Sequence, residues 1–168
     1  MRTAAAAIVV ALAASTAGAK SSSLASLQGD VTVVAFWATT CAPCRKELPF
    51  VEALRQAVAG DARVRVVAVS IDSPGDAARA RKMAHDLGLK APLLVDQSVY
   101  EELFGATDEA RVPRLAVIDR NRGGLERLGA RVHEDADGFV REVTAAIAAV
   151  KAGTTEPPTP IWQPLTHR

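Results

Sequence analysis

The sequence predicts an α/β fold in which a central mixed β-sheet is flanked by helices. Apolar, β-branched runs that fit buried strands alternate along the chain with segments whose apolar residues follow helical spacing. Late in the chain, two short strand-like segments are separated only by a turn at Asn121 to Gly124, which is typical of a β-hairpin. The alternation favours parallel strands and the hairpin adds an antiparallel one, so we expect a partly parallel sheet.

The first strand and the first helix have the clearest patterns. Val31 to Trp37 is β-branched and aromatic with both faces apolar, as in the buried central strand of a sheet. A helix is predicted from about Cys41 to Ala59, because the apolar positions there recur at helical spacing. Pro49 lies inside this pattern and should kink the helix.

The remaining elements continue the alternation. Ser73 followed by Pro74 is typical of a helix start, with Ser73 as the N-cap and Pro74 at the first helical position. We expect this helix to end at Gly88. The other expected elements are strands over Arg63 to Ile71, Ala91 to Val95 and Leu115 to Ile118, the second hairpin strand over Leu125 to Ala130, a short helix over Val99 to Phe104 and a final helix from near Asp135 to near Gly153.

The beginning of the chain has the pattern of a secretory signal peptide. Arg2 precedes an apolar run from Ala4 to Ala14, and Ala17-Gly18-Ala19 supplies the small residues of a cleavage site. The run is shorter than the about 20 apolar residues that a membrane span needs. An uncleaved anchor and an unstructured Ala-rich leader are the alternatives. We therefore expect an exported protein with a signal peptide over residues 1–19, one domain over residues 20–152 and a proline-rich tail over residues 153–168.

The composition is that of an ordinary globular protein, with 49% hydrophobic and 23% charged residues. At 168 residues the chain is long enough for one domain with a proper hydrophobic core. The formal net charge of +1 gives no indication of a nucleic-acid or membrane-surface partner. We expect a monomer.

Both cysteines of the chain lie in one tetrapeptide, Cys41-Ala42-Pro43-Cys44. Their place between a predicted strand and a predicted helix puts a thiol at a helix N-terminus, where unpaired N–H groups and the helix dipole stabilise a thiolate. The thiolate is the nucleophile of disulfide exchange, and a second thiol three positions on is within reach to close a disulfide. A loop this small is a poor structural staple, because stabilisation grows with loop length. We interpret the pair as a reactive dithiol.

Two other interpretations of the cysteines stay open. In the first, they are half of a metal site, although zinc normally takes four ligands and the remaining soft candidates are His85, His133 and His167. His85 is expected to be solvated in the middle of a helix. In the second, the chain is a partner-binding module without redox activity.

The residues around the cysteines resemble a known active site. The segment Phe36 to Pro49 reads FWATTCAPCRKELP, and it is similar to the active-site segment of thioredoxin-like proteins. The likeness is greatest to the exported TlpA/ResA type of bacterial thiol–disulfide oxidoreductase. The order of the predicted elements that follow is similar too, and the resemblance covers about residues 24–152. It implies a thioredoxin-like fold.

The resemblance also implies roles for particular residues. Cys41 corresponds to the attacking thiol and Cys44 to the resolving thiol. Val112-Pro113 matches the cis-proline position, where the residue before the proline offers its backbone to the substrate chain. Trp37 is expected as a packed wall beside the active site, as a substrate contact, or as both. The substrate-binding residues implied in this way are Trp37, Ala42, Pro43, Val112 and Pro113.

The activity implied by the resemblance is reduction of disulfides in exported proteins, in the bacterial periplasm or another extracytoplasmic space. The protein would be tethered there if the leader is not cleaved. Its partners would be substrate protein thiols and disulfides and a membrane-bound electron donor. The Cys41–Cys44 disulfide would itself be the redox centre, with no metal and no organic cofactor. The alternative within the same fold is a copper-binding or copper-delivery protein that uses these cysteines.

The sequence departs from the family pattern at several positions. Thr40 replaces a tryptophan before the first cysteine, Ala35 replaces a buried polar residue, and Arg114 replaces a threonine after the cis-proline. Asp72 is the nearest candidate for the acidic residue that helps to activate the thiols in some members. Glu47 is expected to be a solvated side chain on the first helix, although it is close enough to influence a thiol.

Overall fold

The computed structural model describes Leu27 and residues 30–106, 110–120, 124–128 and 132–154. The predicted signal peptide, most of the predicted tail and most of the turn at Asn121 to Gly124 lie outside these residues. Within them, no helix combines the length and the apolar character that crossing a membrane would take. The predicted division into residues 1–19, 20–152 and 153–168 stays a prediction.

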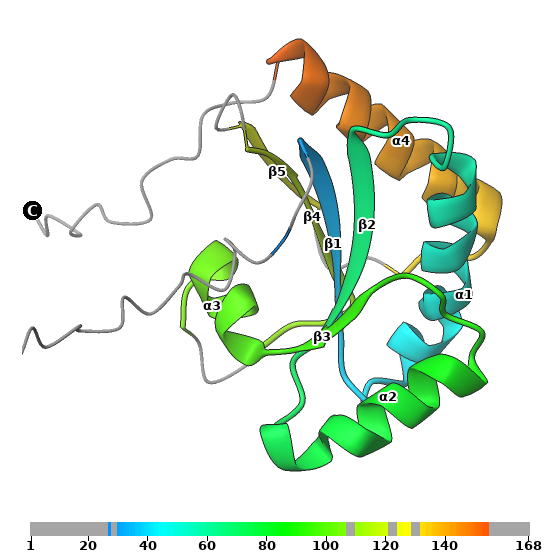
Figure 1. Cartoon of the computed structure of the whole chain (residues 1–168), viewed down its shortest axis with the longest axis vertical. Helices are drawn as coiled ribbons and strands as arrows, with labels where there is room; N and C mark the ends of the chain where they lie inside the picture. The colour runs from blue at the N-terminus through cyan, green and yellow to red at the C-terminus, as the bar shows by residue number, and fades with distance from the viewer. Residues whose placement is uncertain (1–26, 28–29, 107–109, 121–123, 129–131, 155–168) are drawn as a thin grey trace, which may run out of the picture.

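The core of the fold is a five-stranded mixed sheet (Figure 1). Its order is β3-β2-β1-β4-β5. Strands β2 and β3 run parallel to β1, β4 is antiparallel to β1, and β5 is antiparallel to β4. The predicted partly parallel sheet with one hairpin is therefore confirmed. The strands are β1 (Val31–Trp37), β2 (Val64–Ser70), β3 (Leu93–Val95), β4 (Arg114–Asp119) and β5 (Gly124–Leu128).

The central strand β1 is buried along its whole length, as its two apolar faces predict. It pairs with β2 from Val31 opposite Val64 to Trp37 opposite Ser70. On its other side it pairs with β4, where Phe36 lies opposite Arg114. This register brings the carboxyl ends of β1 and β2 and the amino end of β4 to the same edge of the sheet.

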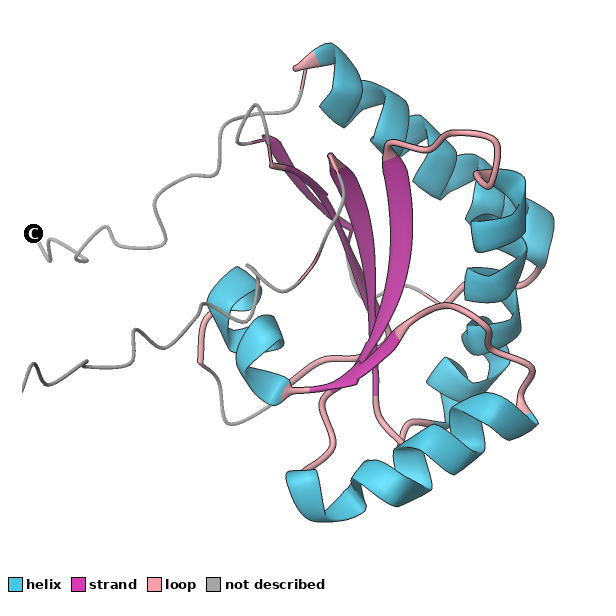
Figure 2. Cartoon of the chain, in the orientation of Figure 1, coloured by secondary structure: helices cyan, strands magenta, loops and turns pink. Residues whose placement is uncertain are grey.

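Helices cover both faces of the sheet (Figures 1 and 2). One face carries a core shared with α1 and α4, and the end of that face near Trp37 packs against α2. The opposite face packs against α3 and Leu27. The helices are α1 (Ala42–Ala57), α2 (Ala77–Asp86), α3 (Gln97–Phe104) and α4 (Ala136–Ala152).

The helix starts show where local expectations were right and wrong. Helix α1 continues through Pro49, and Cys41 is its N-cap rather than its first residue. The start predicted at Ser73 and Pro74 is wrong for an α-helix: residues Pro74–Asp76 form a 3-10 turn, and Ser73 makes no capping bond because its hydroxyl donates to Asp76 instead. Side-chain competition of this kind is common for serine.

Two helix N-caps explain boundaries that the sequence left imprecise. The Asp96 carboxylate accepts the backbone N–H of Ser98, so α3 begins two residues before the predicted Val99. The Asp135 carboxylate accepts the N–H of Gly138 at 2.6 Å and starts α4 near its predicted position. At the far end, Gly153 adopts a left-handed conformation with φ of 69°, which suits glycine at a helix end.

Glu52 of α1 ties this helix to the chain before β3. Its carboxylate accepts two bonds from Arg55 Nε and one from Arg55 Nη2, and it also accepts the backbone N–H of Lys90. The Arg55 guanidinium, with help from Lys90 N–H and the Gln56 amide, outweighs the opposing effect of burial and lowers the pKa of Glu52 to about 2. The charged form is therefore the form that the folded protein favours.

We expect Glu52→Gln to lower the free energy of unfolding at neutral pH by about 1–3 kcal/mol. The contribution of the carboxylate is fully present above the ordinary glutamate pKa and is lost as the pH falls through about 2. Urea unfolding at several pH values measures it, with the exposed Glu134→Gln as the matched control. A wild-type advantage that grows as the solution is acidified would contradict the prediction.

Candidate active site

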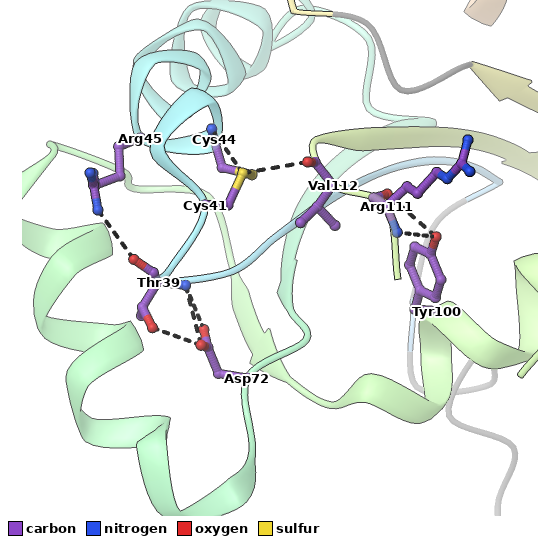
Figure 3. The surroundings of a disulfide bond; sticks show 8 residues. All are labelled: Thr39, Cys41, Cys44, Arg45, Asp72, Tyr100, Arg111 and Val112. Carbon is purple, nitrogen blue, oxygen red and sulfur yellow. Dashed lines mark hydrogen bonds between the residues drawn. A yellow bond between two sulfur atoms is a disulfide. The ribbon is translucent and has the colours of Figure 1, made fainter. Parts of the chain in front are cut away.

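Cys41 and Cys44 form a disulfide at the N-terminus of α1 (Figure 3). The two residues differ in exposure: Cys41 is half-buried, whereas Cys44 is only 1% exposed. Ala42 between them is exposed, and Pro43 is half-buried at the start of the helix. A molecule that approaches from solvent therefore meets the sulfur of Cys41 first.

The helix N-terminus gives the Cys41 sulfur a favourable electrostatic environment. The backbone N–H of Cys44 donates to Cys41 Sγ at 3.2 Å, and the first turn contains no acidic residue. Arg45 and Lys46 are exposed in the same turn. Helix N–H groups and nearby cations favour a negatively charged sulfur, so the reduced form of Cys41 has the surroundings of a reactive thiolate.

The Val112–Pro113 peptide bond is cis, as the family resemblance implies. The Val112 carbonyl oxygen lies 3.5 Å from Cys41 Sγ (Figure 3). In the disulfide the sulfur has no hydrogen, so this is a contact; in the dithiol the Cys41 S–H can donate to this oxygen. Pro113 is buried and its neighbour Val112 is half-buried. The loop that contains them therefore lies next to Cys41, the more accessible residue of the disulfide.

Tyr100 of α3 anchors the residues before the cis bond. Its hydroxyl accepts the backbone N–H of Arg111 at 3.0 Å and can donate to the Arg111 carbonyl at 3.3 Å (Figure 3). The same oxygen accepts Arg114 Nη1 at 3.1 Å. The Arg114 guanidinium lies 3.9 Å above the ring of Phe104. Arg114, the departure after the cis-proline, thus packs against α3.

Asp72 holds the chain segment that leads into Cys41. Its carboxylate accepts the backbone N–H of Thr39 at 2.9 Å, the Thr39 hydroxyl at 2.7 Å and the Ser70 hydroxyl at 2.6 Å. Burial is the largest single influence and raises the pKa of Asp72, but these hydrogen bonds and Arg79 together keep the pKa below its usual value. Arg45 Nη1 donates to the Thr39 carbonyl from the other side.

A small cavity lies directly behind the disulfide. Its volume is about 10 Å³, which is close to the minimum for one water molecule. The buried Trp37, 2% exposed, forms part of the wall, and the position fits the packed-wall role. Trp37 Nε1 and Arg114 Nε are buried without a hydrogen-bond partner among the described residues. The lining comprises Ala35, Phe36, Trp37, Cys44, Glu47, Leu48, Val51, Pro113, Arg114 and Leu115.

The expectation that Glu47 is solvated is wrong. Glu47 is only 4% exposed and lines the cavity together with Cys44. The reason is helical spacing: positions 44, 47, 48 and 51 share one face of α1, and that face packs on the sheet. The spacing of Glu47 from Cys44 was the signal in the sequence that could have placed the carboxylate at the site.

His133 is the residue of the site that sequence reasoning missed. Its backbone N–H donates to Glu47 Oε1 at 2.8 Å, and its ring Nδ1 lies 3.0 Å from the same oxygen. His85, in contrast, has a side chain that is 91% exposed, as expected, and His167 lies outside the described residues. Within the described ranges, no group of three or more His, Cys, Asp or Glu side chains could hold a metal ion.

A reactive cysteine pair at a helix N-terminus, beside a cis-proline loop on a mixed sheet, defines a thioredoxin-like protein. The chain belongs to the AhpC/TSA family, whose family model matches residues 5–123. The thiol-disulfide oxidoreductase ResA of Bacillus thuringiensis (strain Al Hakam) is 25% identical to it over 122 residues, which cover 72% of this chain and 68% of that protein. The thioredoxin-like protein YneN of Bacillus subtilis (strain 168) is 35% identical over 83 residues, 49% of this chain and 48% of YneN.

Solved structures agree with this assignment. The structure of MTB DsbF in mixed oxidised and reduced forms aligns with a TM-score of 0.54 and 26% identity, covering 71% of this chain and 83% of DsbF. A putative protein disulfide isomerase from Bacteroides thetaiotaomicron aligns with a TM-score of 0.60 and 25% identity, covering 78% and 82%. The predicted thioredoxin-like fold is confirmed, and the protein is a thiol–disulfide oxidoreductase with the Cys41–Cys44 pair as its redox centre.

We expect Tyr100→Phe to loosen the loop before Pro113, because the Arg111 backbone loses both bonds to the hydroxyl. The free energy of unfolding should fall by about 1–3 kcal/mol, the usual cost of a buried polar group that loses its partner. Reduction of a protein disulfide should slow several-fold, whereas the reaction of Cys41 with a small alkylating reagent should not change. Urea unfolding, insulin reduction and alkylation rates measure these effects. Unchanged stability together with unchanged insulin reduction would refute the anchoring role.

Proposed function

We propose that this protein reduces disulfides in exported proteins, with Cys41 as the nucleophile and Cys44 as the resolving thiol. The observation that carries the proposal is the asymmetry of the pair. Cys41 is half-buried at the N-cap of α1, where it can be reached, and Cys44 is 1% exposed behind it. Only one of the two sulfurs is placed to exchange with a protein from solvent.

The proposed reaction moves two electrons from the dithiol to the substrate. The Cys41 thiolate attacks one sulfur of the substrate disulfide, so that a mixed disulfide forms and the other substrate sulfur leaves as a thiolate. Cys44 then loses its proton and attacks Cys41 Sγ. The mixed disulfide breaks, the second substrate thiolate leaves, and Cys41–Cys44 closes. The substrate thiolates take protons from solvent.

Glu47 is the group best placed to take the proton of Cys44. The two side chains line the same cavity, lie three positions apart on α1, and are both nearly inaccessible to solvent. A buried thiol needs a nearby proton acceptor because bulk water does not reach it. We therefore assign Glu47 the role of general base towards Cys44, acting directly or through one water in the cavity.

The substrate chain would lie over the surface between the start of α1, at Ala42 and Pro43, and the loop at Val112 and Pro113. The exposed Ala42 and the half-buried Pro43 offer surface beside Cys41, and the Val112 backbone before Pro113 offers polar groups for an extended peptide. Trp37 is buried beneath this surface and supports it by packing against Cys44 and Val112. These assignments follow the family resemblance and the arrangement of the exposed groups.

The signal-peptide pattern of residues 1–19 supports a place outside the cytoplasm, in the bacterial periplasm or its equivalent. A reductant there is oxidised once in every cycle and needs a dithiol donor that carries electrons across the membrane. We propose a membrane-bound donor for that reason, and a monomeric enzyme. No observation favours copper delivery over this function.

The test traps the mixed disulfide. We expect Cys44→Ser to accumulate a covalent complex with a disulfide-containing protein such as insulin, because the first attack proceeds and the second cannot. Cys41→Ser is the matched control and should form no complex. Non-reducing electrophoresis and mass spectrometry of the linked peptides identify the attacking sulfur. A complex through Cys44, or none with either variant, would overturn the assignment.

A further inference from the structure

We propose that His133 positions the Glu47 carboxylate and connects it to solvent through Glu142, so that the proton exchanged by Cys44 travels along Glu47, His133 and Glu142. This inference rests on the proposed function and extends it to residues far from the cysteines in sequence. His133 precedes α4, and its contact with Glu47 joins positions 86 residues apart. Neither the cysteine motif nor the family resemblance points to it.

The three side chains form a continuous line of hydrogen-bonding groups. His133 Nδ1 lies 3.0 Å from Glu47 Oε1, and His133 Nε2 lies 3.2 Å from Glu142 Oε2. Exposure increases along the line: the side chains of Glu47, His133 and Glu142 are 5%, 10% and 30% exposed. One end of the line therefore lies in the cavity with Cys44, and the other end reaches water.

His133 is held firmly enough to act in this way. Its backbone N–H donates to Glu47 Oε1 at 2.8 Å, so both the main chain and the ring of His133 bind the same oxygen. The imidazole packs edge-on against Phe139 of α4, with the ring centres 5.0 Å apart. Both of these contacts of Glu47 use Oε1. They hold the carboxylate at the wall of the cavity that Glu47 shares with Cys44.

The His133 ring lies between two carboxylates. Each ring nitrogen faces a carboxylate oxygen, so a proton in either contact can reside on the nitrogen or on the oxygen. Among the residues that the structure describes, the charged groups that face His133 are Glu47 of α1 and Glu142 of α4, and Arg114 of β4 lines the cavity with Glu47. His133 is therefore the group through which Glu47, buried beside Cys44, is linked to a second carboxylate.

The proton balance of the resolving step follows from this arrangement. Cys44 Sγ–H gives its proton to Glu47 as the Cys44–Cys41 bond forms and the bond from Cys41 to the substrate breaks. Glu47 passes a proton to His133 Nδ1, His133 Nε2 passes one to Glu142, and Glu142 releases it to water. Reduction of the disulfide by a donor dithiol would run the same transfers in reverse.

The experiment follows the reduced full-length protein as it reacts with one equivalent of dithiobis(nitrobenzoate). Attack by Cys41 releases the first coloured thiolate, and attack by Cys44 releases the second. We expect His133→Phe to slow the second release by about tenfold or more and to shift its pH profile, and to leave the first release within about twofold of wild type. His85→Phe, in an exposed histidine of α2, is the matched control and should change neither phase.

His133→Asn separates proton transfer from support of the fold, and it also serves if His133→Phe does not fold. Its amide can donate to Glu47 but neither titrates nor reaches Glu142, so the second release should keep an altered pH profile. Glu142→Gln should alter the same profile. If His133→Asn restores the wild-type rate and pH profile, the role of His133 is structural and the proposal fails. If wild type releases only one thiolate and closes no disulfide, the proposed function itself fails.

Discussion

The site depends on the packing of the first turn of α1 against the carboxyl end of β1. Cys44 and Leu48 lie in one apolar cluster with Trp37, Ala68 of β2 and Ala80 of α2. Because β1 is buried between β2 and β4, the strand end cannot move independently of the sheet. The helix N-terminus is therefore fixed in space, and with it the difference in exposure between Cys41 and Cys44.

Two sets of hydrogen bonds, made by Asp72 and Tyr100, hold the chain segments on either side of the disulfide. Asp72, at the end of β2, holds Thr39 through its main chain and side chain and so fixes the approach to Cys41. Tyr100, from the opposite face of the sheet, holds Arg111 and thereby the loop that brings Val112 to the disulfide. The sulfur chemistry needs only two thiols, but access to them is set by these polar contacts between separate elements.

The structure shows the surroundings of the three residues that depart from the family pattern. Thr40 is exposed next to Cys41, so the surface there is more open and more polar than a tryptophan would make it. Ala35, in place of a buried polar residue, lines the cavity and leaves Glu47 as the carboxylate behind Cys44. Arg114 is drawn to Tyr100 and Phe104 instead of to solvent. Proton transfer is thus assigned to α1 and α4 and not to the central strand.

Local patterns were enough to predict the sheet, the cysteine site and most helices, but not the polar network. The strand over Val31–Trp37 was predicted with the bounds that it has, because a strand that is apolar on both faces has few alternatives. The burial of Glu47 is not expected from its charge, and it follows from the position of Glu47 on the same face of α1 as Cys44. The partnership of His133 with Glu47 depends on how α4 packs on α1, and no local pattern contains that information.

The most direct test of the account is the equilibrium reduction potential of the Cys41–Cys44 couple in thiol/disulfide buffers, read by alkylation of the full chain. A reductant of exported proteins should show one two-electron transition at about −220 mV or below. A potential near about −120 mV would make the protein an oxidant and contradict the proposed direction. The absence of a two-electron transition between these cysteines would contradict the redox function altogether.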